Sequence, residues 1–430
     1  MDTPTLVILA GGASSRMWPL REKSLLRFGD QPLLLAQLAR YQSLGFSQAV
    51  IIGNPENTEL IRELTSDVAG MSVQVGTQPE PKGMGNALLR AGEHLPLDQH
   101  PAVYVTQVHD VTDMALHESI LAAYRADPSA SYLAGVERDE YFPGGYLIID
   151  SQDRINGIIE KPGAANRPSN LVSLVAHIHA DAARLMQAIE AQYRIAETPD
   201  DHYERAMDAL MPDHVFKVAR YRGHWSALKY PWHVLDIMDY FLSQIKGQTV
   251  QEGAFVHKNA ALVGDVFIAE GAKVFPGAAV VGPAYIGSGT IVGNNALVRA
   301  SMVLDRCEVG YTTEVARSYV ADQCSMHACR VLDSVFAPNV NFSAGCTTAN
   351  LRMDRGNVSM RVKGEKMDTG RGKLGAVIGQ GAFLGVDVMT MPGIKIGEGA
   401  QVGPGAHVYS DLSDRTRLLV KQTQTLTPID

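Results

Sequence analysis

Near its start the chain combines an apolar run, a turn of small residues and two cations. Residues 6–10 are Leu-Val-Ile-Leu-Ala, residues 11–15 are Gly-Gly-Ala-Ser-Ser, and Arg16 and Lys23 follow. The apolar run predicts a buried parallel strand, and the small residues let backbone N–H groups approach an anion. Arg16 and Lys23 could offset charge as a bond to phosphorus breaks. The segment matches neither GxxxxGKS/T nor GxGxxG, yet with Pro19-Leu20 it favours a triphosphate-binding loop over an ordinary strand-to-helix turn.

Two later segments carry polar groups that suit a nucleotide. Gln78 and Gly83 lie between a predicted strand and a predicted helix, and Asp110 ends another apolar run. A glutamine amide offers a donor and an acceptor side by side, which suits the edge of a pyrimidine base. A carboxylate at a strand end could hold Mg²⁺ against phosphates, with Asp113 as the alternative. The plainer interpretations are a Pro-Gly loop before a helix and an aspartate that caps a helix.

Glu160 and Lys161 form a third candidate pair, after a predicted strand and before Pro162. The carboxylate could accept hydrogen bonds from vicinal hydroxyls, and the ammonium group could meet a phosphate. Such a pair is common on protein surfaces, so its position after a strand is what makes it informative.

Segments typical of strands and of helices alternate from about Thr5 to Ser243. This alternation predicts a Rossmann-like α/β domain with a mixed, mainly parallel sheet and helices on both faces. Ligands of such sheets bind beyond the carboxyl ends of the strands, where the Gly11 turn lies. The expected strands are residues 7–9, 49–52, 72–75, 102–108, 131–135 and 145–149, and the expected helices are 33–44, 57–68 and 85–95. A change of pattern at residues 245–248 predicts domains at 1–246 and 250–430.

The second domain repeats an apolar residue at every sixth position. The series runs without a slip over Val256, Leu262, Ile268, Val274, Val280, Ile286, Val292 and Val298, and it returns between Ile378 and Val408. This period is typical of a parallel β-helix built from hexapeptides, in which each coil stacks its aliphatic ladder on the next. Residues 344–373 interrupt the repeat with polar and basic residues. They predict a loop excursion, either a solvated loop or a binding element for an anionic ligand.

Composition limits the class of protein. The 430-residue chain has a formal net charge of −8, with 46% hydrophobic and 20% charged residues. The charge argues against nucleic-acid binding, and the absence of an apolar run of membrane-spanning length argues against a membrane protein. Without a basic flank or a cleavage signal at the start, we expect a cytoplasmic protein. Cys307, Cys324, Cys329 and Cys346 show neither CxxC pairing nor metal-ligand spacing, which predicts reduced, mostly buried cysteines.

The glycine turn, Arg16, Pro19-Leu20 and Lys23 resemble the signature of sugar-1-phosphate nucleotidylyltransferases. Residues 78–87 are similar to the base-selecting loop of their uridylyl- and thymidylyltransferases, and Gly145-Tyr146 with Glu160-Lys161-Pro162 to their sugar-binding elements. The resemblance implies that a hexose-1-phosphate reacts with UTP or dTTP, in the presence of Mg²⁺, to give a UDP- or dTDP-sugar and pyrophosphate. It assigns catalysis to Arg16 and Lys23, the metal to Asp110, the nucleotide to Leu9, Gly11, Gly12, Gln78 and Gly83, and the sugar phosphate to Gly145, Glu160, Lys161 and Asn170.

One position departs from this family. Residues 225–232 are similar to the closing element of archaeal-type members, which carry an aspartate two residues after the first Trp, where this chain has Ala227. That aspartate would share Mg²⁺ with Asp110. Three interpretations stay open: Asp110 and the nucleotide phosphates hold Mg²⁺ alone, only an acetyltransferase half is active, or the chain is a non-catalytic nucleotide-sugar-binding regulator. Lys229 could contact a phosphate.

The segments around His327, residues 341–352 and residues 362–375 closely resemble the acetyltransferase half of archaeal bifunctional sugar-1-phosphate nucleotidylyltransferase/acetyltransferases. The resemblance implies a left-handed β-helix, a trimer or a multiple of it, and acetyl-CoA as co-substrate for N-acetylation of an amino-sugar-1-phosphate. His327 would be the general base, a task that suits a near-neutral imidazole. Asn350, Lys363 and Lys373 would meet CoA or the sugar phosphate. The alternative for His327 is a hydrogen-bonded histidine on a coil turn.

Overall fold

The computed structural model describes residues 3–142, 144–195 and 201–429. The chain forms two compact units, one of residues 1–13 with 32–227 and the other of residues 14–31 with 228–430. The segment 14–31, which follows the glycine turn, therefore clusters with the C-terminal part of the chain. The division at 1–246 and 250–430 stays a prediction about which parts fold on their own.

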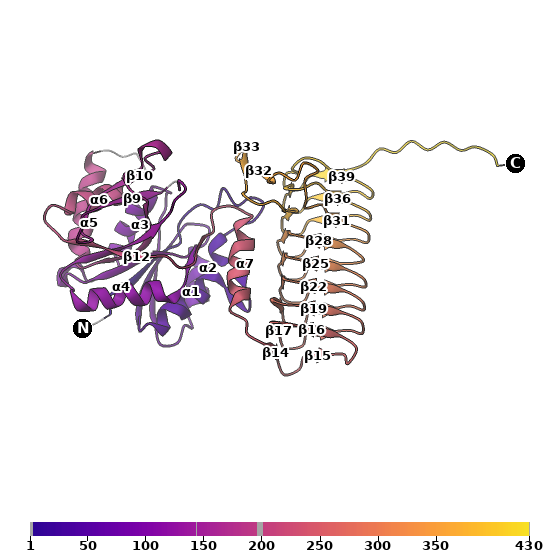
Figure 1. Cartoon of the computed structure of the whole chain (residues 1–430), viewed down its shortest axis with the longest axis horizontal. Coiled ribbons are helices and arrows are strands. Elements are labelled where there is room, and N and C mark those ends of the chain that lie inside the picture. The colour runs from indigo at the N-terminus through magenta and orange to yellow at the C-terminus, as the bar shows by residue number, and fades with distance from the viewer. Residues whose placement is uncertain (1–2, 143, 196–200, 430) are drawn as a thin grey trace. The chain divides into compact units, whose positions relative to one another are not determined.

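A mixed sheet forms the centre of the first unit (Figure 1). Its buried middle strand, Thr5–Leu9 (β1), pairs in parallel with a strand on each side. The antiparallel strands lie beyond β6, so the predicted mixed α/β class is confirmed, and each of the six predicted strands lies within two residues of an observed one. The order is Ile155–Glu160 (β10), Gly145–Ile149 (β9), Leu171–His179 (β11), Val103–Gln107 (β6), β1, Gln48–Gly53 (β4) and Ser72–Thr77 (β5), while Ser131–Glu137 (β8) pairs with β11 and with Phe216–Tyr221 (β12).

Helices pack their apolar residues against this sheet. Ala87, Leu88 and Ala91 of the third helix are fully or almost fully buried and share a core with Val7 and Val50. That spacing places them on one face of the helix. The helices are Leu33–Ser43 (α1), Thr58–Thr65 (α2), Gly83–Gly92 (α3), Met114–Ala126 (α4), Ala182–Ile195 (α5) and His202–Leu210 (α6), with 3-10 turns at Leu97–Gln99 (η2) and Ala164–Asn166 (η3) and a two-stranded ribbon of Asp110–Thr112 (β7) and Trp225–Ala227 (β13).

The second unit is built on a left-handed parallel β-helix with three sheets (Figure 1). Sheet 1 contains Gln248–Val250 (β14), Val266–Ile268 (β17), Ala284–Ile286 (β20), Met302–Val303 (β23), Tyr319–Val320 (β26), Val335–Phe336 (β29), Val377–Ile378 (β34) and Lys395–Ile396 (β37). Sheet 2 contains Phe255–Val256 (β15), Lys273–Val274 (β18), Ile291–Val292 (β21), Glu308–Val309 (β24), Ser325–Met326 (β27), Asn341–Phe342 (β30), Phe383–Leu384 (β35), Gln401–Val402 (β38) and Arg417–Leu418 (β40). Sheet 3 contains Ala261–Val263 (β16), Ala279–Val281 (β19), Leu297–Arg299 (β22), Glu314–Ala316 (β25), Arg330–Leu332 (β28), Thr347–Thr348 (β31), Met389–Thr390 (β36) and His407–Val408 (β39).

The coil continues where the six-residue period is lost from the sequence. Val274 pairs with Val292, 18 residues later, whereas Val320 pairs with Phe336, 16 residues later. The middle coils therefore shorten their corners and keep their aliphatic ladder. The inward residues of these coils belong to the same buried core as those of the regular hexapeptides.

The four cysteines are free and buried, as predicted. Each lies in the β-helix core two positions before a ladder residue, where other coils have alanine, valine or threonine. Burial raises the pKa of the Cys329 thiol to about 11 and that of Cys346 to about 12. Cys329 and Cys346 are therefore packing residues in their protonated form, since a reactive cysteine needs its thiolate.

Four further elements complete the second unit. The interruption of the repeat leaves the coil between β31 and β34, as predicted, and it contains an antiparallel hairpin that the sequence did not indicate, Ser359–Val362 (β32) with Glu365–Asp368 (β33). The segment 14–31 contains a 3-10 turn, Lys23–Leu25 (η1), and Arg27–Phe28 (β2), which pairs with Gln31–Pro32 (β3). A helix, His233–Ser243 (α7), precedes the β-helix.

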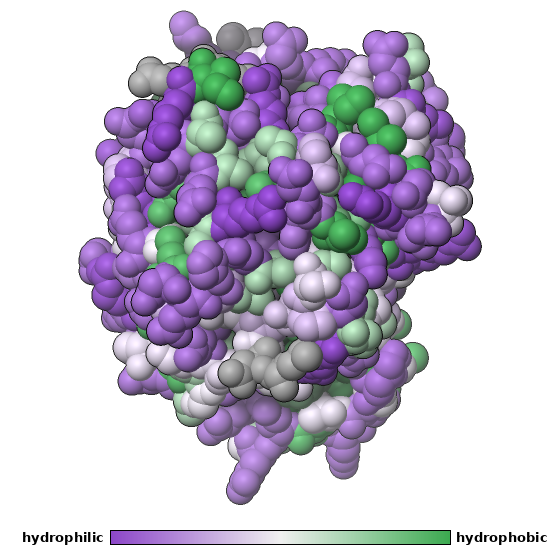
Figure 2. Space-filling model, turned by 90° about the vertical axis from the view of Figure 1, so that its left-hand side faces the viewer, coloured by the Kyte–Doolittle hydropathy of each residue, from purple (hydrophilic) through white to green (hydrophobic). Residues whose placement is uncertain are grey.

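Figure 2 shows the hydropathy of one face of the molecule. In the face shown in Figure 2, hydrophilic residues predominate and hydrophobic ones occur in small separate groups. Among the described residues, no helix is both long enough and apolar enough to span a membrane.

Candidate functional site

The glycine turn after β1 lies against the start of the Gln78 loop. A Cβ atom on Gly11 would lie 2.8 Å from Gln78 Oε1 and 3.0 Å from the carbonyl oxygen of Gly53. A side chain at this position would therefore displace the Gln78 amide or the Gly53 carbonyl. Gln78 follows β5, and its backbone N–H donates to the Gly53 carbonyl at 2.8 Å. Two segments that the sequence singled out therefore meet at the carboxyl edge of the parallel strands.

The Gln78 amide has a defined orientation. Its Nε2 donates to the Gly83 carbonyl oxygen at 2.9 Å and to Asn86 Oδ1 at 3.2 Å. A backbone carbonyl can only accept, so the amide nitrogen must face Gly83, and Oε1 faces the Gly11 turn. Gln78 is 5% exposed. The two N–H groups of Nε2 are thus hydrogen-bonded inside the protein, and the acceptor Oε1 is the atom that Gln78 directs to the Gly11 turn.

The predicted sugar-binding residues are brought to the same edge of the sheet. β11 runs antiparallel to β6, so Asn170, which precedes β11, lies beyond the carboxyl end of β6. The register pairs Glu160 with Gly145, and a Cβ on Gly145 would lie 3.1 Å from Glu160 Oε2. Lys161 Nζ lies 3.0 Å from Glu160 Oε1. The carbonyl oxygen of Asn170 accepts from a backbone N–H, and its side chain is exposed.

Asp110 does not sit in a protein-built metal site. Its Oδ1 accepts from the indole Nε1–H of Trp225 at 3.0 Å, and in the β7–β13 ribbon it pairs directly with Ala227. Asp113, the alternative metal ligand, accepts two hydrogen bonds through Oδ2, one from the Tyr221 hydroxyl and one from a backbone N–H. Among the described residues, no group of three His, Cys, Asp or Glu side chains could hold a metal ion. The donors that the chain provides therefore do not fit a Mg²⁺ site made by protein alone.

Arg16 and Lys23 lie in the segment 14–31, which clusters with the other unit. Arg16 is exposed and Lys23 is partly buried. The backbone N–H of Lys23 donates to Ser14 Oγ at 3.2 Å, so a side-chain hydrogen bond closes the loop between them. Arg16 and Lys23 therefore belong to a different compact unit from Gly11, Gly12, Gln78 and Gly83.

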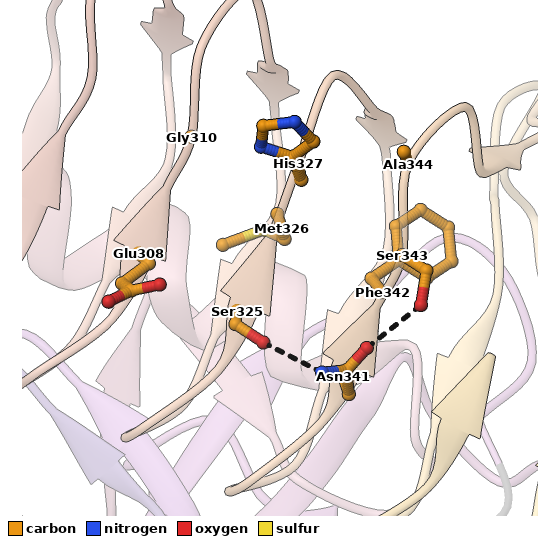
Figure 3. Close-up of a pocket in the computed structure, with 9 residues that line it drawn as sticks. All are labelled: Glu308, Gly310, Ser325, Met326, His327, Asn341, Phe342, Ser343 and Ala344. Atoms are coloured by element: carbon orange, nitrogen blue, oxygen red, sulfur yellow. Dashed lines mark hydrogen bonds between the residues drawn. The ribbon is translucent and has the colours of Figure 1, made fainter. Parts of the chain in front are cut away.

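His327 borders a pocket of about 320 Å³ on the β-helix (Figure 3). The side chains of Glu308, Ser325 and Asn341 follow one another on adjacent strands of sheet 2. Asn341 Nδ2 donates to Ser325 Oγ at 3.2 Å, and Ser343 Oγ donates to Asn341 Oδ1 at 3.0 Å. This hydrogen-bonded row forms one wall, and the exposed imidazole of His327 lies above it in Figure 3. A carboxylate, hydroxyls and an imidazole therefore surround one opening.

The other predicted β-helix residues lie outside the lining of this pocket. Asn350 Nδ2 donates to Asp333, whose carboxylate also receives two hydrogen bonds from Arg317, each 2.7 Å long. Lys363 is at the exposed turn of the β32–β33 hairpin, and Lys373 is exposed where the chain returns to the coil. Within one chain, His327 is thus the one predicted acetyl-transfer residue that borders the pocket.

Three residues that shape the first site received no role from the sequence, although two of them, Asn86 and Trp225, lie inside the segments 78–87 and 225–232. Asn86 orients Gln78, Trp225 binds Asp110, and the Tyr193 hydroxyl donates to the carbonyl oxygen of Lys82 at 2.6 Å. Asn86 could have been found, because it lies one helical turn after Gly83. Tyr193 is more than 100 residues away in the sequence, and no local pattern connects it with that loop.

A glycine turn, a glutamine loop and a strand-end carboxylate at one sheet edge, in a chain that continues into a hexapeptide β-helix, define a class of nucleotide-binding α/β proteins. The chain belongs to the nucleotidyl transferase family, whose model matches residues 5–226. Its sequence resembles sugar-1-phosphate nucleotidylyltransferases that carry a C-terminal β-helix.

Relatives match both halves of the chain. The bifunctional sugar-1-phosphate nucleotidylyltransferase/acetyltransferase of Sulfurisphaera tokodaii is 29% identical over 94% of this chain and 97% of its own. The bifunctional protein GlmU of Methanococcus aeolicus is 28% identical over 94% of this chain and 95% of its own. Among solved structures, a UDP-glucose pyrophosphorylase complexed with UDP-glucose is similar over 56% of this chain and 100% of that chain, with a TM-score of 0.49 and 14% identity.

Proposed function

We propose that the chain is a sugar-1-phosphate nucleotidylyltransferase that uses UTP or dTTP. A phosphate oxygen of the hexose-1-phosphate forms a bond to the α-phosphorus, the bond between that phosphorus and the bridging oxygen breaks, and pyrophosphate leaves. Arg16 and Lys23 offset the triphosphate charge, and Gly145, Glu160, Lys161 and Asn170 hold the sugar phosphate. Alignment and charge neutralisation account for most of the rate in such a reaction.

The observation that carries this proposal is the fixed amide of Gln78 beside the Gly11 turn. A lone acceptor at that place matches the N3–H donor of uracil and thymine, whereas the N3 atom of cytosine is itself an acceptor. A base with a ring N–H at this edge, as in uracil and thymine, is therefore favoured over cytosine. UTP and dTTP share that edge, so both are included.

Pyrophosphate release tests the proposal. The assay supplies Mg²⁺, one of UTP, dTTP, CTP, ATP and GTP, and one of a panel of hexose-1-phosphates. We expect activity with UTP or dTTP and a loss of at least 100-fold in Lys23→Ala, with Lys246→Ala, an exposed lysine outside the site, as the matched control. Silence of the folded wild-type protein across the panel would reject the transferase and leave a nucleotide-sugar-binding protein.

The His327 pocket favours a second activity, N-acetylation of an amino-sugar-1-phosphate by acetyl-CoA. The amine nitrogen forms a bond to the thioester carbon, and the C–S bond breaks to release the CoA thiolate. The His327 imidazole takes the amine proton and returns it to the sulfur, so CoA leaves as the thiol. General-base catalysis by histidine contributes about 10²–10⁴-fold. Asn350, Lys363 and Lys373 are proposed to contact CoA or the sugar phosphate.

Thiol release from acetyl-CoA with glucosamine-1-phosphate tests this second activity. His327→Ala should lower the rate at least 100-fold and leave thermal stability unchanged, because its side chain is exposed. His407→Ala, an exposed histidine on sheet 3, is the matched control. Equal rates in His327→Ala and the wild type would exclude the imidazole as the base.

A further inference from the structure

Between β20 and β34, sheet 1 of the β-helix is apolar on its outside as well as its inside. Its outward residues alternate with the inward ladder, and Tyr285, Met302, Tyr319, Val335 and Val377 are at most 7% exposed. The outward residues of sheet 2, by contrast, include exposed positions such as those in β24 and β35. An outward residue of a sheet is buried only when another part of the molecule covers it, so sheet 1 has a cover.

Part of that cover is the segment 14–31, together with α7. Phe28 is 3% exposed, and its ring stacks on that of Phe241 in α7 at 5.4 Å and packs against that of Tyr319 at 5.5 Å. The Tyr319 hydroxyl donates to the carbonyl oxygen of Arg27 at 2.8 Å. One aromatic residue of the segment is thus inserted between the helix and the sheet.

An ion-pair cluster fixes the same part of the segment. Arg27 Nη1 lies 2.9 Å and 2.8 Å from the two carboxylate oxygens of Asp322, and Nη2 lies 2.8 Å from Asp305 Oδ2. Backbone N–H groups hold both carboxylates. The N–H of Asp305 donates to Asp322 Oδ1, and the N–H of Ser288 donates to Asp305 Oδ1. The coil itself therefore holds the two carboxylates in place for the guanidinium. Charge-assisted hydrogen bonds of this kind are stronger than those between neutral groups.

A second anchor lies on the other side of Lys23. Trp18 Nε1 donates to Asp414 Oδ1 at 2.9 Å, and Lys395 Nζ lies 4.5 Å from the centre of the Trp18 ring. Arg21 pairs with Glu398. The loop is thus attached to the β-helix both before and after Lys23.

We propose that the β-helix is the positioning scaffold of nucleotidyl transfer, and that Arg27 and Phe28 are its positioning residues. These two residues attach the segment 14–31, which carries Arg16 and Lys23, to the β-helix. The attachment is made through Asp305, Asp322 and Tyr319. The proposal rests on the proposed function for the roles of these two cations. Its physical basis is that a loop ordered in advance need not lose its conformational entropy at each turnover.

The test removes charge from the β-helix side and leaves Arg16 and Lys23 in place. The double variant Asp305→Asn with Asp322→Asn keeps the Oδ1 acceptors of the coil but loses the charged partners of Arg27. We expect the KM for UTP to rise and kcat to fall, with kcat/KM lowered at least tenfold, while the KM for the sugar phosphate changes less than twofold. Asp265→Asn is the matched control, because Asp265 accepts a backbone N–H in the same way but contacts Gly247 instead of the segment.

Side-chain replacement on the segment gives the reciprocal measurement. Arg27→Ala should lower kcat/KM as much as the double aspartate variant does. Arg27→Lys, which keeps the positive charge, should retain part of the kcat/KM that Arg27→Ala loses. The variant that combines Arg27→Ala with both aspartate replacements should lose little more kcat/KM than either parent variant, because the three side chains act as one unit. Additive losses would show that Arg27 and the carboxylates act separately and would overturn the proposal.

Limited proteolysis measures the attachment of the segment 14–31 independently of catalytic activity. Trypsin can cut after Arg16, Arg21 and Lys23, and we expect cleavage at least tenfold faster in the double aspartate variant than in the wild type or Asp265→Asn. Faster cleavage with unchanged transfer kinetics, or no change in either, would overturn the proposal. If the wild type releases no pyrophosphate, the proposed function fails. The affinity for UTP, measured by calorimetry, then replaces KM, and an unchanged affinity in the variant overturns the proposal.

Discussion

The orientation of a single amide controls the expected base preference. Gln78→Glu would place a second acceptor oxygen opposite the Gly83 carbonyl and Asn86 Oδ1, where the wild type has a donor. Leaving buried polar groups unpaired costs about 1–3 kcal/mol. We therefore expect a loss of that size in the free energy of unfolding and at least a tenfold loss of turnover with UTP.

Chemical denaturation and the pyrophosphate assay check this prediction for Gln78. Gln74→Glu is the control, because Gln74 lies on the nearby strand β5 and is exposed. Unchanged stability and unchanged UTP turnover in Gln78→Glu would contradict the role given to the amide.

The pairing of Asp110 with Ala227 makes a second prediction at the residue scale. Directly opposed residues of an antiparallel pair have their Cβ atoms about 5 Å apart. Ala227→Asp would therefore place a second carboxylate beside Asp110, and the two negative charges would repel unless a cation lies between them. We expect a gain of at least tenfold in affinity for Mg²⁺, measured by calorimetry with the metal alone.

Ala227→Asn is the control for this variant, because it has the same size without the charge. Equal Mg²⁺ affinity in the wild type and Ala227→Asp would show that the two positions do not form a metal site. The transferase would then have to work with metal held by the nucleotide.

At the scale of elements, β11 and α6 are joined by a buried polar cluster. The Tyr203 hydroxyl lies 2.8 Å from His177 Nδ1 and 2.7 Å from His179 Nε2. A hydroxyl has one hydrogen, so at least one of the two imidazoles must be the donor. Burial lowers the pKa of His177 to about 3 and that of His179 well below its usual value.

This cluster predicts how stability depends on pH. Because the folded-state pKa lies below the unfolded value of about 6.5, the stabilisation is present above pH 6.5 and is lost as the pH falls. Between pH 6 and pH 5 His177 should remove about 1.2 kcal/mol from the free energy of unfolding, and His179 should change it in the same direction. Thermal unfolding of the wild type and of His177→Gln, which does not titrate, measures the difference; identical slopes would refute the assignment.

At the scale of the whole molecule, the β-helix keeps exposed hydrophobic side chains on sheet 2. Phe255 and Phe383 are each 48% exposed, and they lie on the first and the seventh strand of that sheet. The expected assembly therefore rests on the resemblance to the hexapeptide-repeat family, not on an apolar patch. We expect a trimer or a multiple of it. Light scattering should then give a mass of about three times the 46.5 kDa of one chain, or a multiple of that value. A stable monomer at micromolar concentration would reject this assembly.

The sequence by itself determined the two kinds of architecture and most of the candidate residues. The alternation of segments located six strands, and the six-residue period located the first and the last coils, because side-chain periodicity is a local property of the backbone conformation. A short motif with its own chemistry selected the glycine turn, and the resemblance to a known family selected Gln78, Glu160 and His327 as candidates.

Only the tertiary structure decided how these groups are used. The orientation of Gln78, the pairing of Asp110 with Ala227, and the attachment of the segment 14–31 to the β-helix all depend on contacts between residues distant in sequence. The apolar outward residues of sheet 1 are visible in the sequence, yet their alignment appears only when coils of 18 and 16 residues are superposed. Local periodicity defines the elements, whereas burial and charge pairing between distant residues decide which elements meet.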